Sequence, residues 1–254
     1  MRWSFSKLEA YEHCPMMFKL TYLDNAEQQG NGFADFGTLC HELLEGWAKG
    51  DIPIFALAEE YENRFDSVVT SPFPPFPKGL PQKYYEQGLE YFDPFDGFGE
   101  DYEILEVEDK FVIDIEGYTF VGIADFILRN KTTGEIEVVD HKSKSMATMK
   151  KDLPTYRKQL YVYAHHVKQK YGVFPSKLKF NIFRENDWVV EDFNEDMYHE
   201  TLQWIVDTIH RIEKEPDWNV STSSFFCRYI CSVIDSCPAR DAVLYAPKKK
   251  KEEK

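Results

Sequence analysis

The sequence has no apolar run long enough to cross a bilayer. The chain has 254 residues, of which 43% are hydrophobic and 29% charged. Charged residues interrupt its apolar stretches before they reach the roughly 18 residues of a membrane-spanning helix. The first residues also lack the apolar segment of a secretory signal. We therefore expect a cytoplasmic protein with no membrane partner.

Basic residues are scarce as well. The chain has 30 Lys and Arg against 44 Asp and Glu, a formal net charge of -14. Non-specific affinity for nucleic acid comes from Lys and Arg that neutralise phosphates, so this composition argues against a general polyanion binder. A metal-dependent nuclease is still compatible with it, because clustered carboxylates hold metal ions and a local basic groove can lie on an acidic body.

The patterns of apolar residues and turn signals predict helices at both ends of the chain and a sheet between them. The expected helices cover residues 7–22 (interrupted at Cys14-Pro15), 38–49, 54–69, 82–92, 156–171 and 197–212. The expected strands cover residues 104–113, 118–128, 135–140, 178–183 and 188–190. Residues 31–37 and the proline-rich residues 71–81 are expected to be loops. This order predicts an α/β domain with a mixed central sheet flanked by helices.

Two expected neighbouring strands carry acidic residues that can meet. Asp125 lies three residues after Gly122 on one strand, and Asp140, His141 and Lys142 end the next. Alternate side chains of a strand share a face, so Asp140 and Lys142 point together and His141 points away. Paired carboxylates repel each other unless a cation lies between them, and Mg²⁺ or Mn²⁺ prefers such oxygen ligands. On its own this pattern also fits a surface ion pair of little energetic consequence.

Two expected helices add polar residues. His41 follows Gly37 by one helical turn, and Gln159 and Tyr163 lie four residues apart on one helix face. A Gln and a Tyr beside basic residues can contact a nucleic-acid strand. Taken alone, the same residues also fit a half-buried helix with a polar rim and a structural histidine.

Together these residues form four short motifs in a fixed order: G-x-x-x-H, G-x-x-D, D-x-K and Q-x-x-x-Y, between residues 37 and 163. This series resembles the PD-(D/E)XK nuclease superfamily, in particular its RecB-like branch, with Ala124 in place of the proline of the superfamily name. The resemblance implies a restriction-endonuclease-like core and metal-dependent hydrolysis of phosphodiester bonds in DNA.

The resemblance also implies roles for individual residues. Mg²⁺ or Mn²⁺ would be held by His41, Asp125, Asp140 and the backbone carbonyl of His141. Lys142 would act in catalysis together with Asp125 and Asp140, while Gln159 and Tyr163 would position DNA. Glu108, which precedes the expected hairpin, is a candidate for an auxiliary acidic residue.

Three of the five cysteines lie close together in the sequence. Cys227, Cys231 and Cys237 form one group, whereas Cys14 and Cys40 lie far from it. In a cytoplasmic protein such a group favours a metal site over disulfides. A tetrahedral site needs a fourth ligand, and both a [4Fe–4S] cluster and Zn²⁺ accept four cysteines.

The family resemblance favours Cys14 as the fourth ligand. RecB-like nucleases with an iron–sulfur cluster, including AddB and the nuclease of CRISPR adaptation, carry an N-terminal cysteine in a Tyr-x-x-Cys-Pro context, as at Tyr11 to Pro15 here. This implies a [4Fe–4S] cluster on Cys14, Cys227, Cys231 and Cys237 that staples the N- and C-terminal helical segments together, with structural Zn²⁺ as the alternative. A similar cysteine ending in small phage-encoded relatives makes this chain a candidate phage protein, which would act in the host cytoplasm.

We therefore expect a single nuclease domain over residues 1–254. Its expected parts are a helical segment (about 1–100), a catalytic core (101–192), a C-terminal helix with the cysteine motif (193–245) and a charged tail (246–254). The expected activity is that of an exonuclease on DNA ends or single strands in recombination, repair or DNA processing, with a recombination or replication protein as a further partner. The alternatives are a DNA-end-binding or recombination-partner module with little nuclease activity, and a prespacer-processing nuclease of CRISPR adaptation.

Overall fold

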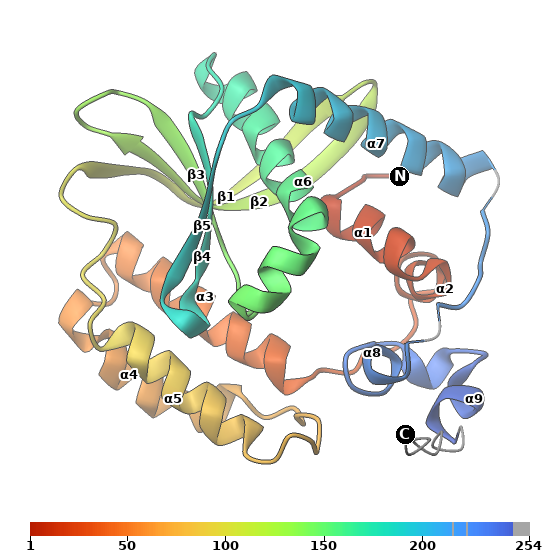
Figure 1. Ribbon diagram of the computed structural model, residues 1–254. Helices are drawn as coiled ribbons and strands as arrows, with labels where there is room; N and C mark the ends of the chain where they lie inside the picture. Colours follow the sequence, from red (N-terminus) through yellow and green to blue (C-terminus); the bar gives the residue numbers. More distant parts are fainter. Residues whose placement is uncertain (215, 222, 246–254) are drawn as a thin grey trace, which may run out of the picture.

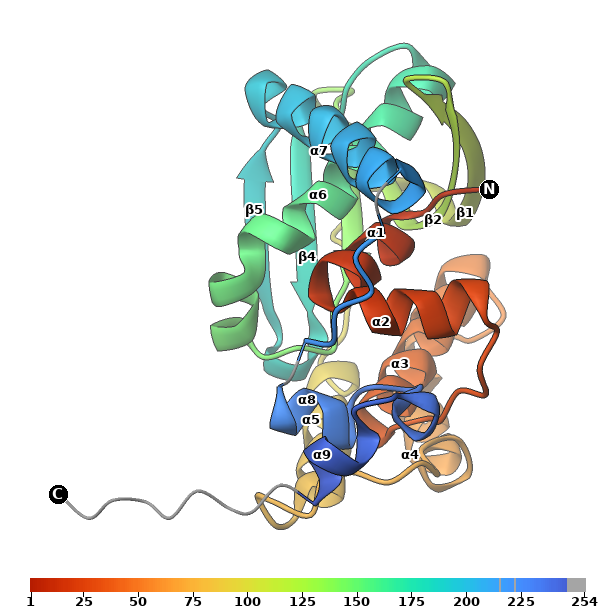
Figure 2. The ribbon, with the colours of Figure 1, turned by 90° about the vertical axis from the view of Figure 1, so that its right-hand side faces the viewer.

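A mixed five-stranded sheet lies between two groups of helices (Figures 1 and 2). The computed structural model describes residues 1–214, 216–221 and 223–245. The strands follow the order β1-β2-β3-β4-β5 across the sheet. Their bounds are β1 (Tyr102–Ile115), β2 (Tyr118–Asn130), β3 (Ile136–His141), β4 (Lys177–Ile182) and β5 (Asp187–Asp192). Only the β3–β4 pair is parallel among these, so the expected α/β class with a mixed sheet is confirmed.

Nine α-helices and four shorter helical turns accompany the sheet in the described part of the chain. The α-helices are α1 (Phe5–His13), α2 (Pro15–Phe18), α3 (Gly32–Lys49), α4 (Leu57–Val68), α5 (Leu80–Phe92), α6 (Met146–Tyr171), α7 (Glu195–Lys214), α8 (Ser224–Tyr229) and α9 (Arg240–Leu244). The shorter turns are η1 (Lys19–Leu23, a π-helix), η2 (Ile54–Ala56), η3 (Phe183–Glu185) and η4 (Ile234–Ser236). None of the described helices is both long and apolar enough to span a membrane.

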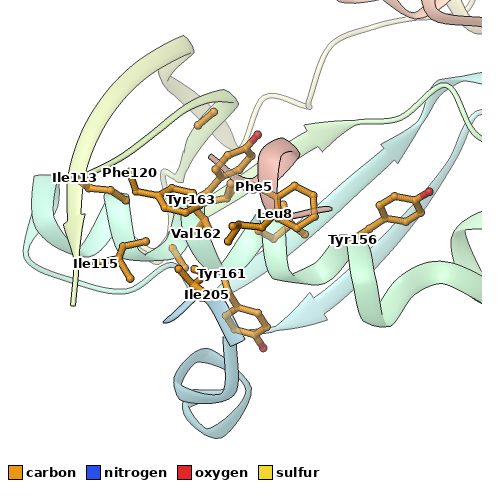
Figure 3. Packing of buried hydrophobic residues seen from close by; sticks show 14 of the residues in the cluster. Phe5, Leu8, Ile113, Ile115, Phe120, Tyr156, Tyr161, Val162, Tyr163 and Ile205 are labelled. Atoms are coloured by element: carbon orange, nitrogen blue, oxygen red, sulfur yellow. The ribbon is translucent and has the colours of Figure 1, made fainter. Parts of the chain in front are cut away.

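Helices α1, α6 and α7 cover one side of the sheet and enclose the larger core. Leu8 of α1, Val162 of α6 and Ile205 of α7 meet the strand residues Ile113 and Phe120 in this core (Figure 3). Helix α7 buries Tyr198, Ile205, Ile209 and Ile212. The isoleucines among them form the apolar stripe on one helix face from which this helix is predicted.

Helices α3, α4 and α5 form the second layer, and their core is rich in aromatic side chains. Phe36 and Leu39 of α3 pack with Tyr61 of α4, and Phe126 and Val139 of the sheet belong to the same core. The two cores meet along β1, β2 and β3, because residues of these strands contribute to both.

Two helices begin well before their predicted first residue. Residues 31–37 are not a loop, since α3 begins at Gly32, where the Asn31 side chain accepts a hydrogen bond from the backbone of Ala34 at 3.1 Å. Helix α6 begins at Met146 and not at residue 156, with Ser145 as its N-cap. Pro154 therefore lies inside α6, on its exposed side, where water can replace the lost backbone hydrogen bond.

The N-terminal and C-terminal segments lie side by side (Figures 1 and 2). As predicted, the first helix breaks at Cys14, after which Pro15 opens α2. The backbone of Met16 donates to the carbonyl of Asn219 at 3.2 Å, so the two segments are joined by hydrogen bonds. The expected charged tail, residues 246–254, lies outside the described residues.

Candidate active site and cysteine cluster

Three side chains from different elements converge where α3 meets the sheet. His41 Nδ1 of α3 lies 3.6 Å from Asp125 Oδ2 of β2 and 3.9 Å from Glu108 Oε1 of β1. One ligand atom from each residue lies within 4.8 Å of the other two. An imidazole nitrogen and two carboxylates are a donor set that Mg²⁺ and Mn²⁺ accept, so these residues fit the divalent cation implied by the sequence.

Two glycines of the motifs allow this close approach. A Cβ atom on Gly37 of α3 would lie 3.3 Å from Ser143 Oγ, in the segment that follows β3. A Cβ atom on Gly122 would lie 2.3 Å from Phe111 Cζ, a distance that real Cβ atoms do not adopt. The first glycine lets α3 pack close to Lys142, and the second leaves room for the Phe111 ring over β2.

Glu108 reaches the site through an irregular part of β1. The register of β1 against β2 shifts between Ile104 and Glu106, and Glu108 has a φ of 49°. A left-handed backbone at a residue other than glycine costs roughly 1 to 3 kcal/mol, and such strain concentrates at functional sites. The auxiliary acidic residue suggested by the sequence therefore lies in the group of side chains that could hold a cation.

Asp140 and Lys142 form a closed ring of polar contacts with two residues of α6. Lys142 Nζ lies 2.6 Å from Asp140 Oδ2 and donates to Gln159 Oε1 at 2.8 Å. Gln159 Nε2 donates to the Tyr163 hydroxyl at 2.6 Å, and this hydroxyl donates to Asp140 Oδ1 at 3.4 Å. The D-x-K and Q-x-x-x-Y motifs are therefore one hydrogen-bonded unit, in which Tyr163 is only 4% exposed.

The buried charges influence one another. Burial and the neighbouring Asp140 raise the pKa of Asp125 to about 7. Burial alone would lower the pKa of His41, but the carboxylates of Asp125 and Glu108 outweigh burial and raise it. Burial would also lower the pKa of Lys142, whereas the Asp140 carboxylate raises it above its usual range. A divalent cation would relieve this crowding of carboxylates.

His141 points away from Lys142, as the alternation of the strand predicts. Its backbone N–H donates to Asp125 Oδ2 at 2.7 Å, and its ring Nδ1 lies 3.0 Å from Asn181 Nδ2. Burial holds the pKa of His141 well below its usual range, so the ring is neutral. Asn181 and its partner Tyr91 (2.6 Å) were not foreseen. The available signal was an asparagine within the apolar strand β4.

The geometry agrees with the comparison with known protein families. A model of the PD-(D/E)XK nuclease superfamily matches residues 2–238. The chain belongs to the PD-(D/E)XK nuclease superfamily. Members of this superfamily are phosphodiester hydrolases that use Mg²⁺ or Mn²⁺, and the expected restriction-endonuclease-like architecture is thereby confirmed.

A solved structure titled "Crystal structure of SSO0001" is 20% identical to this nuclease-superfamily chain, covers 92% of this chain and 94% of its own, and has a TM-score of 0.34. The comparison with curated proteins gave no match.

Four cysteines of this nuclease-superfamily chain gather between the N- and C-terminal segments. Cys14, Cys227, Cys231 and Cys237 line one small apolar pocket. The backbone N–H of Ser221 donates to Cys14 Sγ at 3.4 Å, and Cys227 Sγ donates to the Ser221 carbonyl at 3.5 Å. Cys40 instead belongs to the second core beneath α3. Of the two candidates for the fourth cysteine, Cys14 is therefore the one beside the other three.

Proposed function

We propose that this protein is a Mg²⁺- or Mn²⁺-dependent deoxyribonuclease of the RecB-like branch that degrades DNA from ends or as single strands. The observation that carries the proposal is the approach of His41, Glu108 and Asp125 to within 4.8 Å of one another, next to the Asp140–Lys142 pair. A bound divalent cation would polarise the scissile phosphate and lower the pKa of a water molecule.

Each residue then has a distinct task. His41, Glu108 and Asp125 would hold the cation, and Asp140 and the carbonyl of His141 are further candidate ligands from β3. The ammonium group of Lys142 stabilises the negative charge that develops on the phosphate or orients the attacking water. Gln159 and Tyr163 set the position of the Asp140–Lys142 pair through hydrogen bonds of 2.6 to 3.4 Å. Through this pair they position the DNA strand indirectly.

A short basic path leads away from this site along the first turns of α6. Lys144 follows the catalytic lysine closely, and Lys150 and Lys151 are exposed on α6. Within the described part of the chain, no carboxylate lies within 4.0 Å of these three amines. We assign the exposed Lys150 and Lys151 to the DNA phosphates, because exposed amines outside ion pairs are available to an external anion.

Digestion of end-labelled DNA by the purified chain tests the proposal. Linear single strands and linear duplex should be degraded with Mn²⁺ or Mg²⁺ and protected by EDTA, while closed circular single strands should resist. Lys142→Ala should lower the rate at least about 100-fold, a loss typical for one group that stabilises transition-state charge. Lys110→Ala, at an exposed position of β1, is the matched control and should remain active. Full activity of the Lys142 variant would refute the assignment, and cutting of circles would refute end dependence.

We further propose that Cys14, Cys227, Cys231 and Cys237 hold a [4Fe–4S] cluster. All four cysteines line one pocket between the N- and C-terminal segments, so they can share a single group. Four cysteines are the ligands of a [4Fe–4S] cluster. The Tyr-x-x-Cys-Pro context of Cys14 favours the cluster over zinc, which accepts the same four thiolates.

Anaerobic purification followed by absorption spectroscopy and analysis for iron, sulfide and zinc tests the cluster. Cys14→Ala should lose iron and lower the melting temperature, because the group joins the two ends of the chain. Cys40→Ala, in the second core, is the control and should keep its iron. A colourless protein with stoichiometric zinc would replace the cluster by the zinc alternative.

A further inference from the structure

Two side chains of α6 hold the acidic residues on either side of Glu108. His166 Nε2 lies 2.6 Å from Asp109 Oδ2, and Lys170 Nζ lies 2.8 Å from the same oxygen. Lys170 Nζ also lies 2.5 Å from Glu106 Oε1. Helix α6 thus contacts β1 through ion pairs before and after the irregular position, whereas Glu108 turns toward α3.

The His166 ring is itself firmly placed. It is 8% exposed and stacks on the Phe111 ring with 4.5 Å between centroids and 16° between planes. Phe111 in turn occupies the space above Gly122 on the neighbouring strand. The imidazole therefore joins β1 to α6 from a fixed position.

Glu108 depends on the ion pairs of its neighbours because β1 is irregular at this position. Val107 packs against the second core, whereas Phe111, which a regular strand would place on the same face as Val107, belongs to the first, so β1 turns between these two residues. The contact of the Glu108 carboxylate is with His41 at 3.9 Å, too long for a strong hydrogen bond. Its direction is therefore set by its left-handed backbone, with a φ of 49°, and relaxation to an ordinary extended conformation would turn the side chain elsewhere.

We propose that His166 and Lys170 are positioning residues, which fix Glu106 and Asp109 so that the carboxylate of Glu108 stays beside His41 and Asp125. This inference rests on the proposed function, in that these three residues bind a divalent cation. Loss of a side chain that orients a metal ligand typically weakens metal affinity about tenfold to a hundredfold.

The test compares adjacent histidines of the same helix. His166→Phe keeps a ring for stacking on Phe111 and removes the nitrogen that contacts Asp109. His165→Phe is the matched control, because His165 contacts the Tyr198 hydroxyl at 2.7 Å and the backbone carbonyl of Asp114 at 3.0 Å, close to the C-terminal end of β1 and away from Glu106 and Asp109. Titration calorimetry with MnCl₂ and no DNA should give about tenfold weaker affinity for the first variant and an affinity near that of the unmodified protein for the second.

A double variant shows whether the effect passes through Glu108. In a Glu108→Gln background, His166→Phe should cause no further loss of Mn²⁺ affinity, because the ligand that it orients is already removed. An equal loss in both backgrounds, or unchanged affinity of the single variant, would overturn the proposal. Should His166→Phe fold poorly, Lys170→Met on the more exposed side of α6 replaces it, with Lys168→Met as its control.

Hydrogen exchange without metal separates this inference from the proposed function. Peptides that cover residues 105–110 should exchange faster in His166→Phe than in His165→Phe, whether or not the site binds a cation. Unchanged exchange there would refute the positioning role. Failure of the unmodified protein to bind Mn²⁺ would refute the proposed metal site instead.

Discussion

Asp125→Asn should stabilise the metal-free protein while abolishing its response to Mn²⁺. Asp125 is 7% exposed and close to a second carboxylate, and these surroundings raise its pKa from 3.8 to about 7. An amide carries no charge but keeps an oxygen that can accept the 2.7 Å hydrogen bond from the backbone of His141. The substitution therefore removes the electrostatic cost of the site and preserves its local hydrogen bond.

The pH dependence follows from the direction of this pKa change. The raised pKa means that the folded state keeps a proton which the unfolded state loses. The resulting stabilisation is complete below a pH of 3.8 and is lost as the pH rises through about 7. At about 1.4 kcal/mol for each pH unit, the full loss is about 4 kcal/mol. With some relaxation around the charge we expect the amide to recover about 2 kcal/mol, a rise in melting temperature of roughly 4 to 8 °C.

Thermal unfolding in EDTA at about pH 8.5 and about pH 5 measures this effect. The variant should melt higher at the alkaline pH, and the difference should shrink at the acidic pH, where Asp125 is protonated. Saturating Mn²⁺ should stabilise the unmodified protein by about 2.7 kcal/mol at 100 times its Kd and leave the variant unchanged. Asp66→Asn, on the exposed side of α4, is the control. A lower melting temperature of Asp125→Asn in EDTA at alkaline pH would show that the carboxylate is not under electrostatic strain.

Three further substitutions test separate parts of the argument. Gly122→Ala should lower the stability by about 1 to 3 kcal/mol, because its Cβ would overlap the Phe111 ring; an unchanged melting temperature would contradict the packing argument. Tyr163→Phe should slow DNA hydrolysis while Mn²⁺ affinity changes little, since the Tyr163 hydroxyl links Gln159 to Asp140. Hydrolysis at the rate of the unmodified protein would show that this hydroxyl has no role in catalysis. Lys150→Gln with Lys151→Gln should weaken single-strand binding and reduce the salt slope by about 1.4, the value for two phosphate contacts, as fluorescence anisotropy over a salt series can measure; an unchanged slope would place the DNA elsewhere.

The sheet and the main site were predictable because their signals are local. Each of the five strands lies where alternation and turn residues indicate it. His41 lies beside Asp125 and Lys142 beside Asp140, since strand neighbours and a packed helix bring such positions together, while the roles of these residues remain a prediction. Family membership follows from the same residues, because the order of motifs encodes the order of the strands and helices that carry them.

Other features depend on interactions between distant segments. Pro154 suggested a boundary, yet α6 continues through it because tertiary packing of the helix outweighs one lost hydrogen bond. The left-handed backbone of Glu108 gives no signal in the sequence, because a residue other than glycine keeps such a conformation only where the surrounding structure supports it. The resemblance favoured Cys14 over Cys40, and the fold agrees with it, because Cys14 lies beside the other three cysteines and Cys40 lies in the second core.

The amino-acid sequence by itself determined the succession of elements and the chemical groups available for a metal-dependent hydrolase, since periodicity and residue type act over a few neighbouring positions. The tertiary structure alone decided that Glu108 joins His41 and Asp125, that Gln159 accepts a hydrogen bond from Lys142, and that Tyr163 links Gln159 to Asp140. These contacts join residues far apart in the chain, and their distances are set by how the layers pack on the sheet.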